Sequence, residues 1–244
     1  MLIKDSAICI RTLDYSETSQ IVTLFTRSHG KIDAIAKGSK RPKSPFDGPI
    51  ESISCGHVVF TETRSRLATL TEFDRQPLFT EVRKNLFILN CALFAAELLN
   101  GLTHENDPNP PLFDDITTFI CTLQRAEDHT EATALLIVFQ LTLLERIGSA
   151  PVLNACVNCR NTAVEKWSRT FFSSSVNGLL CGDCEPHFTD KIRLSQKAAK
   201  CLKNLRSIPD ATADTVGEIE KLLIRHFTEF LQYPPRMAKH VIPQ

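Results

Sequence analysis

Four cysteines in this sequence have the spacing of metal ligands. They form two C-x2-C pairs, Cys156 with Cys159 and Cys181 with Cys184, within the stretch CVNCRNTAVEKWSRTFFSSSVNGLLCGDC. Each pair can sit on one tight turn that directs both thiolates at a common ion, and four thiolates favour tetrahedral zinc. Because the protein would fill all four positions, leaving none for water or substrate, we predict one structural zinc ion.

Three other interpretations of these cysteines remain open: disulfides, an iron–sulfur cluster, or unligated buried thiols. His187 is a further candidate that could replace one cysteine ligand. A reducing compartment would argue against disulfides, and a doubled motif is not typical of a redox C-x-x-C site. Small buried hydrophobic side chains are predicted for the remaining cysteines, which are Cys9, Cys55, Cys91, Cys121 and Cys201.

A second candidate site is the basic segment AKGSKRPKSPFDG, from residue 36 to 48. Its cations are Lys37, Lys40, Arg41 and Lys43, and glycine and proline among them predict a loop. Such a loop can contact the phosphates of a flexible nucleic-acid strand, with Phe46 nearby to stack on a base or to pack. The alternative is a solvated charged turn, which is the more common role of a short basic run.

Composition restricts where such a contact can lie. The 28 basic and 28 acidic residues give a formal charge of zero, but cations outnumber acids in residues 1–80 and 156–244, and acids outnumber cations in residues 81–155. An overall neutral protein cannot bind nucleic acid by bulk attraction, so any contact must be local. The first residues, MLIKDSAICIRTLDYSE, lack the features of a signal peptide, and we predict a cytoplasmic protein. The apolar run at 132–144 is too short to span a bilayer.

The first eighty residues predict a small β-barrel. Short runs rich in Ile, Val, Thr and Phe recur with turn residues between them, and the strands we expect are SAICIRTL, SQIVTLFT, KIDAIAK, ISCGHVVFTE and RLATLTEF. Five short strands with long connections fit an OB-fold better than a sandwich. We therefore predict an OB-fold nucleic-acid-binding domain at residues 1–79.

Helical periodicity dominates the rest of the chain. We expect helices at 81–102, without a break before Gly101, and at 111–126, 131–148, 194–208 and 214–231. The last should bury one apolar face, made of Ile219, Leu222, Leu223, Phe227, Phe230 and Leu231. The fold class predicted is multidomain α+β, with a helical domain at 80–244 and a zinc-binding insert at about 152–188. In that insert a hairpin with Asn177-Gly178 as its turn brings the two cysteine pairs together.

Catalytic motifs are absent from the sequence. No G-x-x-x-x-G-K-[ST] or G-x-G-x-x-G run occurs, and no serine lies in a nucleophile elbow. The adjacent Asp114 and Asp115 start a predicted helix, where acids usually complement the helix dipole. We predict a protein without enzymatic activity.

Longer motifs resemble the RecO family of bacterial DNA repair and recombination mediators. The stretch YSETSQIVTLFTRSHGKIDAIAKGSKRPKSPFDGPIE, at 15–51, is similar to the N-terminal region of that family in its Y-x-E-x-S opening, its T-L-F-T strand, its G-K-I turn and its A-K-G-x-[KR]-R-x-K-S-x-F-x-G run. The order C-x2-C, F-S, G-L-L-C-x2-C at 156–184 is similar to zinc-containing members. One departure is Asn177-Gly178, where those members usually have two glycines. An asparagine that tolerates positive φ should accommodate it.

This resemblance implies a non-enzymatic protein that binds single- and double-stranded DNA and anneals complementary strands. With a partner called RecR, it would help load recombinase onto strands coated by single-strand DNA-binding protein, and its place would be the nucleoid. The DNA-binding residues it implies are Lys37, Lys40, Arg41, Lys43 and Lys31, and the zinc ligands are the four paired cysteines. Tyr15 and Phe46 match the motif and are predicted to pack in the barrel.

The family also docks the acidic, apolar C-terminal tail of single-strand DNA-binding protein on its helical domain. Such a tail needs cations at the rim of a groove, and the candidates, expected on one helix, are Lys197, Lys200, Lys203 and Arg206. Two alternatives stay open beside this function. One is a zinc-containing OB-fold adaptor that binds RNA or serves transcription, and the other is a hydrolase acting on nucleic acid.

Overall fold

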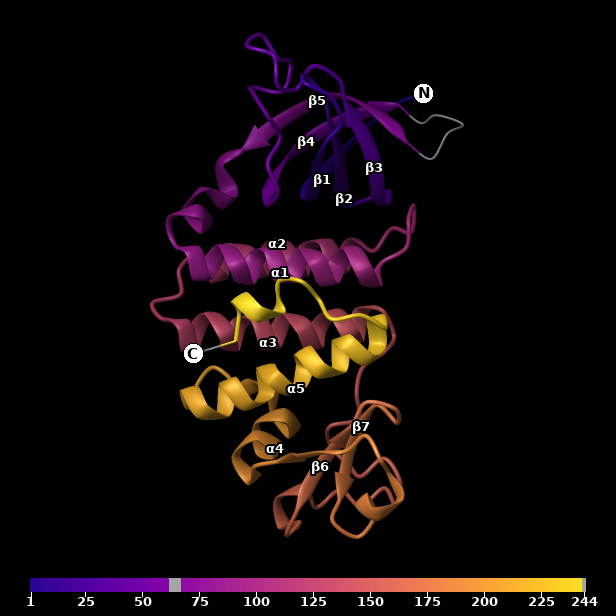
Figure 1. Cartoon of the computed structure of the whole chain (residues 1–244), viewed down its shortest axis with the longest axis vertical. Helices are drawn as coiled ribbons and strands as arrows, with labels where there is room; N and C mark the ends of the chain where they lie inside the picture. The colour runs from indigo at the N-terminus through magenta and orange to yellow at the C-terminus, as the bar shows by residue number, and fades with distance from the viewer. Residues whose placement is uncertain (62–66, 243–244) are drawn as a thin grey trace. The chain divides into compact units, whose positions relative to one another are not determined.

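The structure is a computed structural model that describes residues 1–61 and 67–242 (Figure 1). It mixes α-helices and β-strands, in agreement with the α+β class. By its internal contacts the chain divides into two compact units, an N-terminal unit at Met1–Arg125 and a C-terminal unit at Ala126–Gln244. Among the described residues, no helix combines the length and the apolar character that a bilayer span requires.

Five strands of the N-terminal unit close into a barrel, drawn in indigo and magenta in Figure 1. They are β1 (Leu2–Asp14), β2 (Gln20–Thr26), β3 (Gly30–Ala36), β4 (Ser54–Thr61) and β5 (Ala68–Gln76). The order is β1-β2-β3-β5-β4, with antiparallel neighbours except for the parallel pair β3 and β5. All five predicted strands are therefore confirmed. The expected end of the fourth at Glu62 and start of the fifth at Arg66 lie outside the described residues.

Alternation of side chains along the strands makes the barrel core. In β3 the buried positions alternate with half-buried ones, as a strand with one face inside requires. Ile32 and Ala34 point into the core, where they join Val22 and Leu24 of β2. Phe46, from the long β3–β4 connection, is 1% exposed and belongs to the same core, so its predicted packing role is confirmed.

Two helices complete the N-terminal unit after the 3-10 segment η1 (Pro77–Lys84). They are α1 (Leu86–Leu102) and α2 (Pro110–Leu123). The predicted continuous helix from residue 81 is wrong at its start, because Asn85 adopts an extended conformation with φ −125° and ψ 120°. Its side chain instead accepts hydrogen bonds from the N–H groups of Phe87 and Ile88, and so caps α1.

The barrel is tied to this helical pair by contacts at the β2–β3 turn. Gly30 has φ +70°, and a Cβ at this position would lie 2.4 Å from the carbonyl oxygen of Asp107, so only glycine fits. Arg27 donates two hydrogen bonds, of 3.0 and 2.8 Å, to the carboxylate of Asp114 in the first turns of α2. These contacts place α1 and α2 in one compact unit with the barrel. We predicted that the barrel at 1–79 and the helical segment at 80–244 are separate domains, and this boundary stays a prediction.

The C-terminal unit combines helices with a small sheet. Its helices are α3 (His129–Arg146), α4 (Gln196–Lys203) and α5 (Ala213–Leu231). Its strands are β6 (Thr170–Ser173), β7 (Gly178–Cys181) and β8 (Ile192–Leu194), in the order β7-β6-β8. The remaining elements of this unit are short 3-10 segments: η2 (Val164–Lys166), η3 (Glu185–His187), η4 (Leu205–Ser207) and η5 (Ala238–His240).

Helices α3 and α5 pack side by side in the C-terminal unit (Figure 1). Most of the predicted apolar face of α5 is buried, including Leu223 and Phe227. The prediction is wrong at the end of the helix, where Phe230 is 45% exposed and Leu231 is half-buried. Helix α5 ends at Leu231, because Gln232 after it has a left-handed conformation. The last turn of the helix extends past the buried surface.

Between α3 and α5 lies a buried polar pair. The amide of Gln140 donates hydrogen bonds of 2.9 and 3.0 Å to the two carboxyl oxygens of Glu220, and both residues are 0% exposed. Burial raises the pKa of Glu220 to about 8, and the bond from Gln140 offsets this only in part. The Oε1 atom of Gln140 has no hydrogen-bond partner among the described residues. A protonated Glu220 can donate to it, which would complete a reciprocal pair.

Glu220→Gln should therefore stabilise the protein at high pH. Folding raises the pKa of Glu220 from 4.5 to about 8, so the folded state binds the extra proton and stability falls as pH rises through this window. Glutamine does not ionise, and it can accept one hydrogen bond from the amide of Gln140 and donate one to the Oε1 atom of Gln140. The variant should match the wild type near pH 4.5 and exceed it by roughly 3–5 kcal/mol at pH 8 in urea unfolding. The control is Glu229→Gln, an exposed position on the same helix, and a pH-independent difference between E220Q and wild type would refute this assignment.

Candidate metal centre and nucleic-acid interface

The cysteine cluster is positioned by the β6–β7 hairpin and the segment before it. Asn177 ends the hairpin turn with φ 52°, the positive value that the sequence required of it. A Cβ on Gly178 would lie 2.6 Å from the carbonyl oxygen of Val152 and 2.5 Å from a methyl carbon of Val157. Glycine at this position therefore lets the segment carrying the first cysteine pair lie directly against β7, which ends at Cys181 of the second pair. Backbone hydrogen bonds from Val157 to Leu179 and from Leu179 to Val152 fix this arrangement.

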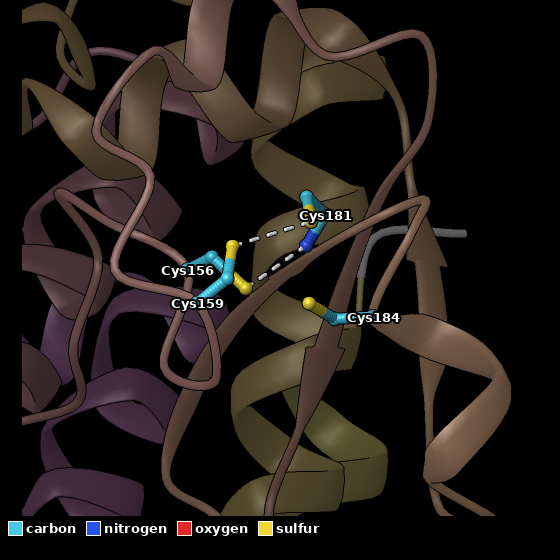
Figure 2. A group of neighbouring side chains, drawn as sticks. All are labelled: Cys156, Cys159, Cys181 and Cys184. Carbon is cyan, nitrogen blue, oxygen red and sulfur yellow. Dashed lines mark hydrogen bonds between the residues drawn. The ribbon is translucent and has the colours of Figure 1, made fainter.

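The four cysteine side chains converge on one point, as Figure 2 shows. Their sulfur atoms all lie within 4.8 Å of one another, and the Sγ atoms of Cys159 and Cys181 are 3.8 Å apart. A tetrahedral zinc ion with Zn–S bonds of about 2.3 Å separates its sulfurs by about 3.8 Å, so the donor set fits this metal. A disulfide requires sulfurs about 2.05 Å apart, and all nine cysteines are free. Among the described residues, the group that could hold this ion consists of the four cysteines, without His187.

Local electrostatics prepare the cluster for a cation. Burial opposes ionisation of Cys156, but backbone N–H groups of Cys159, Cys181 and Asn158 outweigh it and lower its pKa to about 7. One of these donors is the N–H of Cys181, 3.5 Å from the Cys156 sulfur. Burial raises the pKa of Cys181 itself to about 12. One thiolate thus forms readily near neutral pH, and a bound divalent cation would deprotonate the others.

The other cysteines lie apart from this cluster. Cys9, Cys55 and Cys91 are buried, as predicted for small hydrophobic side chains. Cys121 and Cys201 are only half-buried, so for these two the prediction of burial is wrong in degree.

The basic loop, defined here as residues 37–43, is anchored through its backbone and presents its cations to solvent. The N–H of Gly38 donates to the hydroxyl of Ser19, and the N–H of Lys40 donates to the carbonyl of Thr18, so the β1–β2 turn holds the loop in place. The side chain of Lys40 forms an ion pair with Asp14. The three cations that are exposed and form no ion pair with any described residue are Lys37, Arg41 and Lys43.

An exposed aromatic ring lies in the turn that holds this loop. Tyr15 is 61% exposed, which corrects the prediction that it packs in the barrel. Its N–H donates to the carbonyl of Ser19, the residue whose side chain also binds the loop at Gly38. Phe46, by contrast, is too deeply buried to stack on a base. The polar neighbours of Tyr15, in DYSETS, were the available signal for its exposure.

Lys31 occupies a different environment from the basic loop. Its ammonium donates hydrogen bonds of 2.6 Å to the carbonyls of Asn100 and Thr103, at the C-terminal end of α1. Burial lowers its pKa, and the charges of Asp33 and Glu105 oppose that shift. An ammonium has three donors, so one remains for a phosphate oxygen. The role predicted for Lys31 in DNA binding stays a prediction, beside an observed role in capping α1.

The predicted tail-binding cations do not share one helix. Helix α4 ends at Lys203, and Arg206 lies in the following 3-10 segment η4 because Asn204 leaves the helical conformation. Lys203 forms an ion pair of 2.7 Å with Glu165. Lys197 and Lys200 are exposed on α4. The expectation of a single helix is therefore corrected, and the binding role of these residues stays untested.

A five-stranded barrel with a basic loop and a second compact unit with a cysteine cluster define a protein of mixed α and β class. Two family models match it, Recombination protein O N terminal over residues 1–75 and Recombination protein O C terminal over residues 83–237. The chain belongs to the RecO family of DNA repair proteins.

Curated relatives support this membership over most of the chain. It is 31% identical over 237 residues to the DNA repair protein RecO of Bacillus pumilus, covering 94% of this chain and 90% of that protein. It is 33% identical to RecO of Rhodopirellula baltica, covering 86% and 77%, and 33% identical to RecO of Bacillus subtilis, covering 83% and 76%. The expected likeness to the RecO family is thus confirmed.

Proposed function

We propose that this protein is a DNA repair and recombination mediator that binds single- and double-stranded DNA and anneals complementary strands. With RecR it would help load recombinase onto strands coated by single-strand DNA-binding protein, acting in the cytoplasm at the nucleoid. Membership of the RecO family supports a role in repair. The observation that carries DNA binding is the basic loop, whose Lys37, Arg41 and Lys43 are exposed, form no ion pair with a described residue and lie on a backbone held by hydrogen bonds.

The barrel supports this proposal through its strand order. A closed order β1-β2-β3-β5-β4, with β3 parallel to β5, fits an OB-fold, which we propose as the fold of the DNA-binding domain. OB-folds combine a positively charged groove for the backbone with aromatic side chains for the bases. Here the basic loop would supply the charge, and Tyr15 in the neighbouring turn would supply the ring.

Annealing follows from charge neutralisation. Two DNA strands repel through their phosphates, and a protein that neutralises several phosphates lowers that barrier. Contacts to phosphates leave the base edges free to pair. No nucleotide hydrolysis is needed, which agrees with the proposal that the protein is not an enzyme.

Zinc is proposed as a structural ion held by the cysteine cluster. The geometry of the four sulfurs supports this ligand set, and when bound the ion would link the segment before β6 to the end of β7. Four protein ligands leave no open position for catalysis. We also propose that the acidic tail of single-strand DNA-binding protein binds beside the exposed cations of α4 and η4, namely Lys197, Lys200, Lys203 and Arg206.

Tyr15→Ala tests the aromatic part of the interface. Base stacking on an aromatic side chain contributes about 1–3 kcal/mol per base, so the variant should bind single-stranded DNA about 5- to 150-fold more weakly. The fold should be unaffected because the ring is largely exposed. Tyr15→Phe keeps the ring and should bind like the wild type in fluorescence anisotropy. Equal binding by Y15A and wild type would remove this residue from the interface.

Competition between nucleic acids tests the proposed function against its RNA-binding alternative. Labelled random-sequence single-stranded DNA is displaced by unlabelled DNA or by poly-uridine at equal salt. DNA should compete at least as well as poly-uridine, since phosphate contacts and stacking do not require a 2′-hydroxyl. Preferential displacement by poly-uridine would favour the RNA adaptor. Metal-dependent cleavage of the strands during a long incubation would instead indicate a hydrolase.

A further inference from the structure

The outer face of the barrel carries three aliphatic side chains in register on neighbouring strands. Leu13 of β1 pairs with Ile21 of β2, and Ile21 pairs with Ile35 of β3. Directly opposed residues of adjacent strands have Cβ atoms about 4.5–5.5 Å apart, so the three side chains form one continuous strip. We call Leu13, Ile21 and Ile35 the aliphatic row.

The aliphatic row points away from the barrel interior. Val22 and Ala34, which neighbour it along β2 and β3, belong to the core, and side chains alternate between the two faces of a strand. Leu13 is 46% exposed, and Ile21 and Ile35 are half-buried. A solvated sheet face is normally polar, so adjacent aliphatic side chains there indicate a surface that contacts a ligand.

Helices of the same unit cover a different part of this outer face. Two rows further along the strands, Phe25 of β2 stacks on Phe113 of α2 with ring centroids 6.2 Å apart. Lys31, the partner of Phe25 on β3, donates hydrogen bonds to the C-terminal end of α1. The row between is polar, and the hydroxyl of Thr23 donates a 2.6 Å hydrogen bond to Asp33. The aliphatic row thus lies in the half of the face away from these helix contacts.

Positive charge borders the aliphatic row. The basic loop begins two residues after Ile35. Arg11 lies in the neighbouring row of β1 and is exposed. Asp14, which follows Leu13, forms an ion pair with Lys40, so this acid is already neutralised. An apolar strip bordered by cations complements a polyanion that also carries apolar faces, and an unpaired nucleic-acid strand has both properties.

We propose that the aliphatic row binds the faces of unpaired bases, and that this contact makes the protein distinguish a single strand from a duplex. The inference rests on the proposed DNA-binding function and names the part of the strand that the barrel holds. Every unpaired base exposes an apolar face, whereas in a duplex the faces are stacked on one another. The side chains of the row have no hydrogen-bonding group, so they read no sequence and leave the base edges free to pair.

This selectivity would help the protein to release an annealed product. A single strand contacts the basic loop through its phosphates and the aliphatic row through its bases. A duplex offers its phosphates alone, because pairing and stacking withdraw the base faces. Annealing therefore removes one of the two contacts, and the product is held less tightly than the strands from which it forms.

Strands without bases isolate the proposed contact. Fluorescence anisotropy compares a labelled single strand with an abasic strand of the same length, which keeps every phosphate but has no base. The ratio of the two affinities measures base contact, and the salt slope measures phosphate contact. The duplex of the first strand forms a third arm.

The test variant combines Leu13→Thr, Ile21→Thr and Ile35→Thr, because threonine retains a high propensity for strands. We expect L13T/I21T/I35T to lower the affinity ratio about tenfold, the effect of removing about two methylene groups from an apolar contact. Its affinities for the abasic strand and the duplex, and its salt slope, should stay those of the wild type, because the row holds no cation. Tyr15 is unchanged, so part of the preference for bases remains.

Two controls accompany this variant. Leu2→Thr changes a 63% exposed leucine at the other end of β1 and should keep the wild-type ratio. Valine at the three positions of the row retains the aliphatic character and should keep most of the ratio. If the threonine variant does not fold, Leu13→Thr alone should lower the ratio about threefold, the effect of about one methylene group.

The two possible failures are distinguishable. An unchanged ratio in the folded threonine variant would overturn this inference, leave the proposed function intact and make the row a contact for protein. Equal losses for the single strand, the abasic strand and the duplex would also overturn it, because the substitutions would then act on the phosphate contacts. A wild type that binds none of the three would overturn the proposed function itself.

Discussion

Replacing Cys156 and Cys184 together with serine is expected to lower the melting temperature of the protein by about 10 °C or more. Structural zinc contributes about 10–16 kcal/mol to folding in small zinc-binding peptides, and each kcal/mol corresponds to several degrees in a unit of this size. The two residues come from different segments, so their loss disconnects the chain before β6 from the end of β7. Calorimetry measures the transition, and atomic emission should find one zinc per wild-type chain and none in the variant.

Cys201→Ser is the matched control, because it removes a half-buried thiol of the same unit that lies outside the cluster. It should keep its zinc and melt within a few degrees of the wild type. A chelator should reproduce the effect of the double variant on wild-type protein. The structural role of the metal would be refuted if C156S/C184S stayed folded with an unchanged transition but lost annealing alone.

Removing the cations of the basic loop is expected to weaken DNA binding and to make it less dependent on salt concentration. The variant has alanine at Lys37, Lys40, Arg41 and Lys43. The loss of Lys37, Arg41 and Lys43 should lower the salt slope on single strands by about 2, at roughly 0.7 per phosphate contact. Lys40 adds less, since its ammonium is engaged by Asp14. The fold should persist because backbone hydrogen bonds, which alanine retains, anchor the loop. Titrations of labelled strands over a range of salt concentrations measure the slope.

A control with the same loss of exposed charge separates local contact from general attraction. Alanine at Lys221, Arg225 and Lys239 removes three exposed cations of the C-terminal unit. This variant should keep the wild-type slope. If both sets of substitutions lowered the slope equally, the basic loop would not be a specific binding site.

The sequence patterns predicted the elements that are determined by residues close together in the sequence. Runs of β-branched and aromatic residues identified all five barrel strands, because alternation along a strand requires only the strand and one buried face. The cysteine pairs were found because a C-x2-C turn is itself a local structure. Glycine at 178 was expected as a turn residue, but its close approach to Val152 and Val157 depends on a segment more than twenty residues away.

Features that depend on tertiary contacts were not predictable from the sequence. Asn85 interrupts an apolar helical pattern because its side chain competes for the backbone N–H groups that follow. Tyr15 fits a strand motif but lies beyond the buried part of β1.

The most direct test of the central claim is annealing of two complementary oligonucleotides coated with single-strand DNA-binding protein, followed by fluorescence transfer without any nucleotide. The account predicts rapid pairing that depends on the wild-type basic loop. It is contradicted if no pairing occurs while the protein binds the bare strands tightly, because the protein would then be a nucleic-acid binder without mediator activity.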